Sequence, residues 1–292
     1  MSEAAPTFDL QSHSRHSDGA LAPADVVRAA AQAGVELLAL TDHDTVCGVG
    51  EALAAAGEVG IRVVPAVEIS TIDVRGADLH ILGYLLDADD RDLMERLQSY
   101  RGQREGRAAA IVQAIKDVGF EIDEAALDAR AARGESIGRP HLAQAVVSVP
   151  ANASRLEAEG ISEPSEFLVA YLIEGKPAFR PRQGPSVPDA VAAIHAARGI
   201  AIWAHPFWDV SEPDLVRETI DRFRSYGIDG VECFYPTFDR EQTELLCDAC
   251  EARGMLTTGS SDFHGPDHRE FSRFRAFSTH GREPALGPIA AG

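Results

Sequence analysis

The chain has 292 residues, of which 45% are hydrophobic and 25% are charged, a balance typical of one large or two ordinary globular domains. Its net charge of −19 argues against a long nucleic-acid duplex as partner, because affinity for a duplex depends on basic side chains that neutralise phosphates. A small phosphorylated ligand is compatible with this charge, since bound divalent metals can reverse the local sign.

Membrane insertion and secretion are also not expected. No apolar run approaches the roughly 18–20 residues that span a bilayer. The first ten residues lack the basic and apolar regions of a secretory signal. The four cysteines, at positions 47, 233, 247 and 250, indicate a reduced, cytoplasmic protein rather than a disulfide scaffold.

The first 86 residues alternate between two kinds of pattern. Residues 23–34 predict a helix, with Pro23 near its start and Gly34 near its end, and a second helix is expected over about 48–59. The apolar runs 35–40, 61–69 and 77–86 predict buried strands. Such alternation favours parallel βα units.

The middle of the chain has a different, helical pattern. Residues 91–119 predict a long amphipathic helix or helix pair, and the segments IDEAALDARAA and GRPHLAQAVVS predict shorter helices. A proline-bearing stretch, 175–188, marks the exit. We therefore expect an inserted helical subdomain over 88–187 within a barrel formed by 1–87 and 188–292.

Alternation resumes after this insertion and continues to the tail. Helices are expected over 188–198, 213–226 and 238–253, and strands over 199–204, 228–234 and 255–260. The tail from about residue 271 has the least interpretable pattern.

Polar side chains suited to metal binding follow or lie within most of the apolar runs. They are Gln11 and His13 after TFDL, His43 after VELLAL, Glu68 after VVPAV, His80 inside LHILGY, His205 after GIAIWA, and Asp262 with His264 after MLTTGS. The carboxyl ends of the strands of a parallel barrel meet on one face. One such residue alone could cap a helix, as Asp42 or Asp44 could. Many of them on one rim indicate a metal site.

The ligand types narrow the choice of metal. Imidazole with carboxylate and without thiolate suits Zn, Mn or Fe rather than a structural cysteine-type zinc. More than four candidate ligands imply more than one ion. Paired ions can stabilise both the attacking and the leaving oxygen of a phosphoryl group.

The segments DLQSHSRHSDG, LLALTDHDT, VEIS, LHILGY, AHP and SSDFH, in this order, resemble the PHP (polymerase and histidinol phosphatase) family. The IGRPH segment (137–141) is similar to the branch of small phosphoesterases that act on nucleoside 3′,5′-bisphosphates and short RNA. The resemblance implies an α/β fold, a distorted (β/α)7 barrel with a metal cluster at its C-terminal rim. It also implies a metal-bridging hydroxide that attacks phosphorus directly, with no phospho-enzyme.

The resemblance further implies two or three divalent ions of Mn, Zn, Fe or Mg. Their ligands would be His13, Glu68 and Asp262 for the first ion, Glu68, His80 and His205 for the second, and Asp18, His43 and His264 for the third. The residues with catalytic roles would be Asp18, His43, Glu68 and His264.

Gln11 departs from the family pattern, which has His-x-His where this chain has Gln-x-His. An amide oxygen is a neutral and weaker ligand for a transition metal than imidazole, so we expect a looser first site or a harder ion such as Mn or Mg. The alternative is that Gln11 only hydrogen-bonds a metal-bound water.

Basic residues are the expected anchors for a second phosphate of the substrate. Arg139 and His141 lie in IGRPH, and Arg180 lies with Lys176 and Arg182 in the exit loop. Arginine binds phosphate bidentately. Solvated surface charge is the alternative for each of them.

Three functions compete. The first is hydrolysis of a phosphomonoester on a small nucleotide, either a nucleoside 3′,5′-bisphosphate or short 5′-phosphorylated RNA. The second is a phosphatase for histidinol phosphate or for a cyclic or sugar phosphate. The third is a non-catalytic metal-binding module. The insertion and IGRPH favour the first.

Overall fold

The computed structural model describes residues 6–74, 78–132, 137–181 and 184–291 and divides into two compact units. The first unit comprises residues up to Gln98 and from Pro185 onward, and the second comprises Ser99–Gly184. The first boundary therefore lies inside a long helix, α3 (Arg91–Asp117), rather than before it at residue 88.

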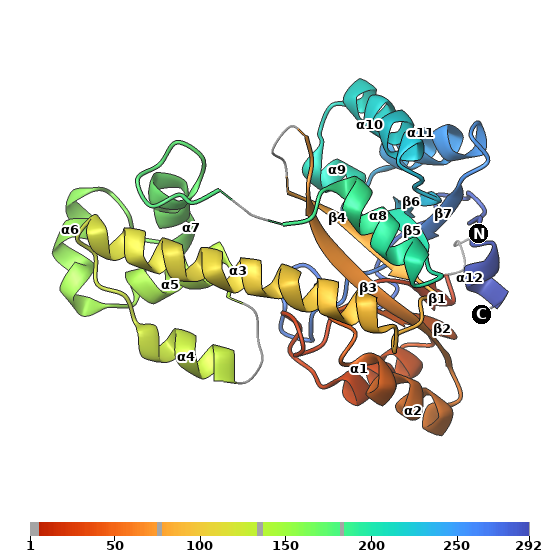
Figure 1. Cartoon of the computed structure of the whole chain (residues 1–292), viewed down its shortest axis with the longest axis horizontal. Helices are drawn as coiled ribbons and strands as arrows, with labels where there is room; N and C mark the ends of the chain where they lie inside the picture. Colours follow the sequence, from red (N-terminus) through yellow and green to blue (C-terminus); the bar gives the residue numbers. More distant parts are fainter. Residues whose placement is uncertain (1–5, 75–77, 133–136, 182–183, 292) are drawn as a thin grey trace. The chain divides into compact units, whose positions relative to one another are not determined.

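A seven-stranded sheet forms the centre of the first unit, with its strands in chain order (Figure 1). The strands are β1 (Phe8–Asp9), β2 (Leu37–Leu40), β3 (Arg62–Ile72), β4 (Asp78–Tyr84), β5 (Ile200–Trp203), β6 (Gly230–Phe234) and β7 (Leu256–Gly259). Their central residues are almost all buried, which explains why each appears in the sequence as an apolar run.

One strand runs against the others. β1, β2 and β3 pair in parallel, as do β5, β6 and β7, but β4 is antiparallel to both β3 and β5. The expectation of parallel βα units over the first 86 residues was therefore wrong at β4. Only residues 73–77 separate β3 from β4, and so short a connection cannot contain the crossover helix that parallel neighbours need.

The sheet curls until its two edges approach each other. The backbone N–H of Leu10 donates to the carbonyl of Gly259 at 3.1 Å, and that of His13 donates to Phe263 at 2.8 Å. An isolated parallel bridge joins Ser12 to Phe263. The sheet is thus a nearly closed barrel, and the segments that follow β1 and β7 lie side by side.

The helices of the first unit lie outside this sheet (Figure 1). They are α1 (Pro23–Gln32), α2 (Val49–Val59), α8 (Val187–Ala196), α9 (Pro206–Asp209), α10 (Pro213–Ser225), α11 (Arg240–Glu251) and α12 (Pro288–Ala291). α8 begins at a capping box in which Ser186 accepts from the N–H of Asp189, and α11 begins at one between Asp239 and Gln242. α1 and α2 bury Val26, Val27 and Ala52 against Leu38 of β2.

The second unit is helical and has a hydrophobic core of its own. Besides most of α3 it contains α4 (Glu124–Ala132), α5 (Arg139–Val147), η1 (Pro150–Asn152), α6 (Ala153–Ala158), α7 (Pro164–Phe167) and η2 (Leu168–Leu172). Phe167 is fully buried there, edge-on to Phe120 and stacked on Tyr171.

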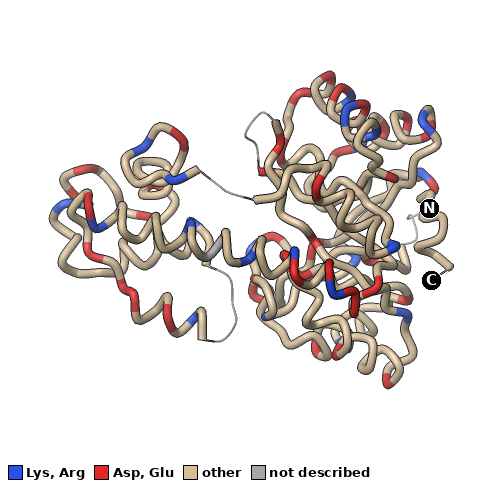
Figure 2. The backbone as a smooth tube through the Cα atoms, viewed as in Figure 1, with Lys and Arg blue, Asp and Glu red and all other residues tan. Residues whose placement is uncertain are grey.

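Acidic side chains occur along the helices of both units, with fewer basic ones among them (Figure 2). Among the described residues, no helix combines the length and the apolar character that crossing a membrane requires.

Candidate metal centre

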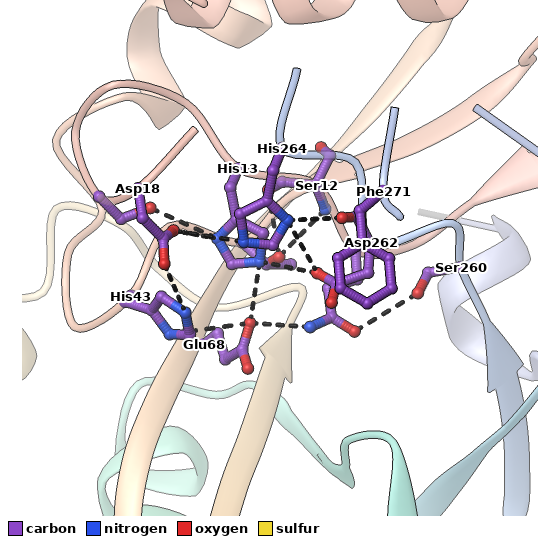
Figure 3. Close-up of polar contacts among 12 residues, drawn as sticks. Ser12, His13, Asp18, His43, Glu68, Ser260, Asp262, His264 and Phe271 are labelled. Carbon is purple, nitrogen blue, oxygen red and sulfur yellow. Dashed lines mark hydrogen bonds and ion pairs between the residues drawn. The ribbon is translucent and has the colours of Figure 1, made fainter. Parts of the chain in front are cut away.

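Segments that follow the strands bring most of the candidate ligands together (Figure 3). The loop after β1 carries His13 and Asp18, the segment after β2 carries His43, and the segment after β7 carries Asp262 and His264. His205 lies between the end of β5 and the start of α9, and Glu68 lies within β3.

His80 reaches the same cluster from the opposite direction. β4 is antiparallel, so the near end of this strand is its amino-terminal end, and His80 is its third residue. Ser70 of β3 pairs with His80, and an isolated bridge joins His43 to Glu68. The reversed strand thus still delivers an imidazole to the rim formed by the carboxyl ends of its neighbours.

The carboxylate of Glu68 lies at the centre of the cluster and is fully buried. Its Oε1 is 2.6 Å from Nδ1 of His80 and 3.4 Å from Nε2 of His205. Its Oε2 is 3.1 Å from Nε2 of His13 and 3.9 Å from Nδ1 of His43. Four rings therefore surround a single carboxylate.

Two further carboxylates complete the cluster. Asp18 lies 3.5 Å from a ring nitrogen of each of His13, His43 and His264. Oδ1 of Asp262 lies 3.1 Å from Nε2 of His13. The ring of His13 therefore lies between Glu68, Asp18 and Asp262.

The described residues contain three groups of side chains close enough to hold a metal ion. They are His13, Asp18, His43 and His264; His43, Glu68 and His80; and His13, Glu68 and Asp262. The last is the set expected for the first ion. The group of His43, Glu68 and His80 has His43 where the set expected for the second ion has His205. The group of four contains the set expected for the third ion together with His13.

The cluster contains buried polar atoms that a cation would satisfy. Six of these atoms lie close to groups of suitable charge but, within the described part of the chain, make no hydrogen bond. They are His13 Nε2, Asp18 Oδ1, His43 Nδ1, His80 Nδ1, His205 Nδ1 and Asp262 Oδ1. Buried polar groups are normally hydrogen-bonded. Imidazole nitrogens and carboxylate oxygens are suitable ligands for Zn, Mn and Fe, so the side chains fit divalent ions.

The electrostatics of the cluster also suit cations. Burial alone would raise the pKa of Glu68, but the imidazoles of His43 and His80 outweigh it and hold that pKa well below its usual value. Burial similarly opposes ionisation of Asp18, whose pKa His43 and His264 hold well below the usual range. Burial lowers the pKa of His43 to about 3, which leaves that ring neutral. Metal ligands need such deprotonated forms. For His13, His205 and His264 the neighbouring carboxylates outweigh burial and raise the pKa, so a cation bound there would displace a proton from each ring.

Gln11 contacts Glu68 through its amide nitrogen. Nε2 of Gln11 donates to Oε2 of Glu68 at 2.9 Å, and its Oε1 accepts from the hydroxyl of Ser260 at 3.4 Å. Both ends of the buried amide therefore have protein partners. The assignment of Gln11 as a metal ligand stays a prediction.

Two residues that follow strands of the site have backbone angles that non-glycine residues rarely adopt. His205 has φ of 28° and Asp262 has φ of 52°. Such conformations are costly and persist where the surrounding structure imposes them, often at functional sites. Their positions next to β5 and β7 support a functional role for this rim.

Two further residues support the cluster, and sequence reasoning missed their roles. Tyr235 donates its hydroxyl to Oδ2 of Asp262 at 2.7 Å, and Glu232 accepts from the N–H of His205 at 2.9 Å. Tyr235 directly follows the apolar run 228–234, and Glu232 is the charged residue inside it, which are the signals that could have revealed them. Asp42 does not cap α2, which begins at Val49 after the N-cap residue Gly48 and has no side-chain cap.

The expected phosphate anchors belong to the second unit. Arg139 and His141 lie in the first turn of α5, where Nδ1 of His141 accepts from the N–H of Gly138 at 3.0 Å. The guanidinium of Arg180 donates to the carbonyl of Phe179 at 2.8 Å. Arg182 lies outside the described residues.

Comparison with known proteins agrees with this fold and these side chains. A model of the PHP domain matches residues 9–125. A 5′-3′ exoribonuclease of Haemophilus influenzae is 35% identical over 259 residues, which are 89% of this chain and 90% of that protein. A 3′,5′-nucleoside bisphosphate phosphatase of Chromobacterium violaceum is 32% identical over 260 residues, covering 89% of this chain and 87% of that protein.

A solved structure is similar over almost the whole chain. It is an amidohydrolase from Chromobacterium violaceum with bound sulfate and no metal, and it matches with a TM-score of 0.81 at 29% identity, covering 98% of this chain and 96% of that one. Its match extends well past the residues of the family model. The chain therefore belongs to the PHP family of metal-dependent phosphoesterases.

Proposed function

We propose that this chain hydrolyses a phosphate ester of a small nucleotide, either the 3′-phosphate of a nucleoside 3′,5′-bisphosphate or the terminal residue of short 5′-phosphorylated RNA. The observation that carries the proposal is the buried carboxylate of Glu68 within 4 Å of four imidazoles. The names of the two relatives, a bisphosphate phosphatase and an exoribonuclease, support a nucleotide as substrate.

We further propose that the cluster holds two or three divalent ions. The ligands would be His13, Glu68 and Asp262 for one ion, Glu68, His80 and His205 for the next, and Asp18, His43 and His264 for the third, with Gln11 beside the first. Bound divalent ions would activate water and neutralise the charge of a phosphoryl group.

The exposure of the ligands supports one direction of substrate entry. The side chains of His13 and Glu68 are fully buried, whereas those of Asp18 and His80 are 27% and 24% exposed. A phosphate would therefore reach the cluster beside Asp18 and His80. Glu68 would act from behind, where its negative charge offsets that of the cations and its position orients the surrounding rings.

Arg139, His141 and Arg180 remain the proposed contacts of a second phosphate. Each carries or can carry positive charge in a chain with a net charge of −19, so any of them near an anionic substrate would favour its binding. The proposal that these residues contact a second phosphate rests on their charge and on the IGRPH motif.

Phosphate release from adenosine 3′,5′-bisphosphate in Mn²⁺, with L-histidinol phosphate assayed in parallel, tests the proposal. We expect release from the bisphosphate and a loss of at least about 10³-fold in turnover for Glu68→Ala, because removing one element of electrostatic stabilisation commonly costs 10²–10³-fold and Glu68 serves two ions. Leu53→Ala, a change of an exposed side chain on α2, is the control.

Each outcome has a defined meaning. Release from histidinol phosphate alone would replace the nucleotide with the second substrate class. Release from neither, with metal bound, would favour a non-catalytic metal-binding module. Normal activity of Glu68→Ala would refute the assignment of the site.

We also propose a cytoplasmic location. Cys47, Cys233, Cys247 and Cys250 are free thiols, and Cys233 and Cys250 lie 3.9 Å apart without a bond. Unpaired neighbouring thiols suit a reducing compartment.

A further inference from the structure

Trp208 is an exposed aromatic side chain next to the candidate metal centre. It is 53% exposed, and the other large hydrophobic side chains exposed among the described residues are aliphatic or Met. Trp208 lies on α9, and its backbone N–H donates to the backbone carbonyl of His205 at 2.9 Å. A single exposed hydrophobic residue needs no explanation, but one fixed beside a reactive centre has a defined setting.

The indole of Trp208 packs against two buried rings. Its ring centroid is 5.7 Å from that of Phe271 and 6.4 Å from that of Tyr235, and those two rings are 5.8 Å apart. Phe271 and Tyr235 are only 7% and 2% exposed. The indole therefore has a rigid support while half of it stays open to solvent.

The same supporting rings contact the metal-ligand candidates. Phe271 lies 5.7 Å from the ring of His264, beside which it is drawn in Figure 3, and Tyr235 lies 5.5 Å from the ring of His205. The exposed ring of His268 stacks on Phe271 at 5.3 Å. Phe271 therefore connects Trp208 with His264, and Tyr235 connects Trp208 with His205. These rings form one continuous cluster of aromatic side chains.

We propose that Trp208, supported by Phe271 and Tyr235, is the stacking platform for the base of the nucleotide substrate. The proposal rests on the proposed function for its substrate class. An uncharged ring attracts a base without the charge repulsion that an acidic chain offers, and every base has a face that can stack. The other tryptophan, Trp203, is fully buried against Phe223 and cannot serve.

Kinetics of two substrates test this platform. Adenosine 3′,5′-bisphosphate has a base, and ribose 3,5-bisphosphate does not. For Trp208→Ala, we expect KM for the adenosine compound to rise about 10- to 100-fold more than KM for the ribose compound, as expected for losing one base–aromatic contact. Trp208→Phe should recover most of the loss, and Leu53→Ala should resemble the wild type. Metal content of every variant is measured, since Trp208 is close to His205.

Fluorescence gives a second readout that does not depend on turnover. The chain has two tryptophans, and Trp203 is buried, so acrylamide mainly quenches Trp208. Saturating adenosine 5′-monophosphate in Mn²⁺ should reduce this quenching severalfold, and ribose 5-phosphate should not. Trp208→Phe should lose the protected component.

The results separate this inference from the proposed function. Hydrolysis of the adenosine compound with equal KM changes for both substrates would refute the platform and leave the function standing. If neither compound is hydrolysed, the function fails, and the quenching decides the platform: protection by the adenosine nucleotide supports it, and absence of protection overturns it. Protection by ribose 5-phosphate as well would also overturn it.

Discussion

Gln11 connects two buried residues of the site through one amide group. Its nitrogen donates to Glu68, and its oxygen lies 3.4 Å from the hydroxyl of Ser260, whose single proton is shared with Glu232 at 2.6 Å. Such a chain of hydrogen bonds fixes the orientation of the Glu68 carboxylate. It does so without the strong ligand for a transition metal that a histidine would supply.

Replacing Gln11 with histidine should increase metal binding. Imidazole is a better ligand for Mn, Fe or Zn than a neutral amide, so we expect Gln11→His to retain up to one additional ion per chain, or to bind its weakest ion about 10- to 100-fold more tightly. Elemental analysis and chelator competition measure this. Gln11→Leu, which removes the amide at similar size, is the control. Unchanged metal content in Gln11→His would mean that position 11 does not contact an ion.

The sequence indicated the candidate ligands because each follows or interrupts an apolar run. His43, His205 and Asp262 could be found in this way, and the structure brings them to one rim. It did not indicate the residues that hold them, such as Tyr235 and Glu232, because a hydrogen-bond partner depends on which strands become neighbours. That information is absent from the spacing of residues along one segment.

At the scale of elements, the loop after β1 depends on the end of β2. Asp42 follows β2 and accepts three hydrogen bonds at 2.7 Å, from the N–H of Ser14 and from the hydroxyls of Ser14 and Ser17. The carboxylate is 1% exposed. Asp42 therefore fixes the loop that carries His13 and Asp18.

Removing this carboxylate should weaken both folding and metal binding. Asp42→Ala leaves three donors without their acceptor, and we expect a loss of about 2–4 kcal/mol in the free energy of unfolding. Urea denaturation measures this loss, and titration with Mn²⁺ should show weaker binding. Asp42→Asn, which keeps one acceptor, should lose less. Wild-type stability of Asp42→Ala would show that the loop holds its shape without Asp42.

The strands could be located from the sequence to within a few residues, but not all of their directions could be. Burial on both faces makes a strand an apolar run whichever way it points, so the run at β4 contains no sign of its direction. The short polar connection before it was the available signal. The tail was hardest to interpret because hydrogen bonds to segments distant in the sequence fix it. One of them runs from the backbone N–H of Arg275 to the carboxylate of Asp9 at 2.7 Å.

At the scale of the whole molecule, the two units contain different kinds of stabilising interaction. The second unit has an apolar core centred on Phe167, whereas the first also encloses the buried carboxylates and imidazoles of the site. Burying charged groups is costly unless they are paired or bind metals. The stability of the first unit should therefore depend on divalent ions, and that of the second unit should not.

Thermal unfolding tests this dependence. An ion at about 100 times its dissociation constant stabilises the folded state by about 2.7 kcal/mol, which corresponds to a rise of roughly 5–10 °C in Tm for a protein of this size. We expect that rise on replacing EDTA with Mn²⁺, and its loss in Glu68→Ala, because Glu68 contacts ligands of two sets. Hydrogen exchange should locate the added protection in residues up to 98 and from 185 onward. Equal protection of 99–184, or a Tm that ignores Mn²⁺, would contradict a metal-dependent first unit.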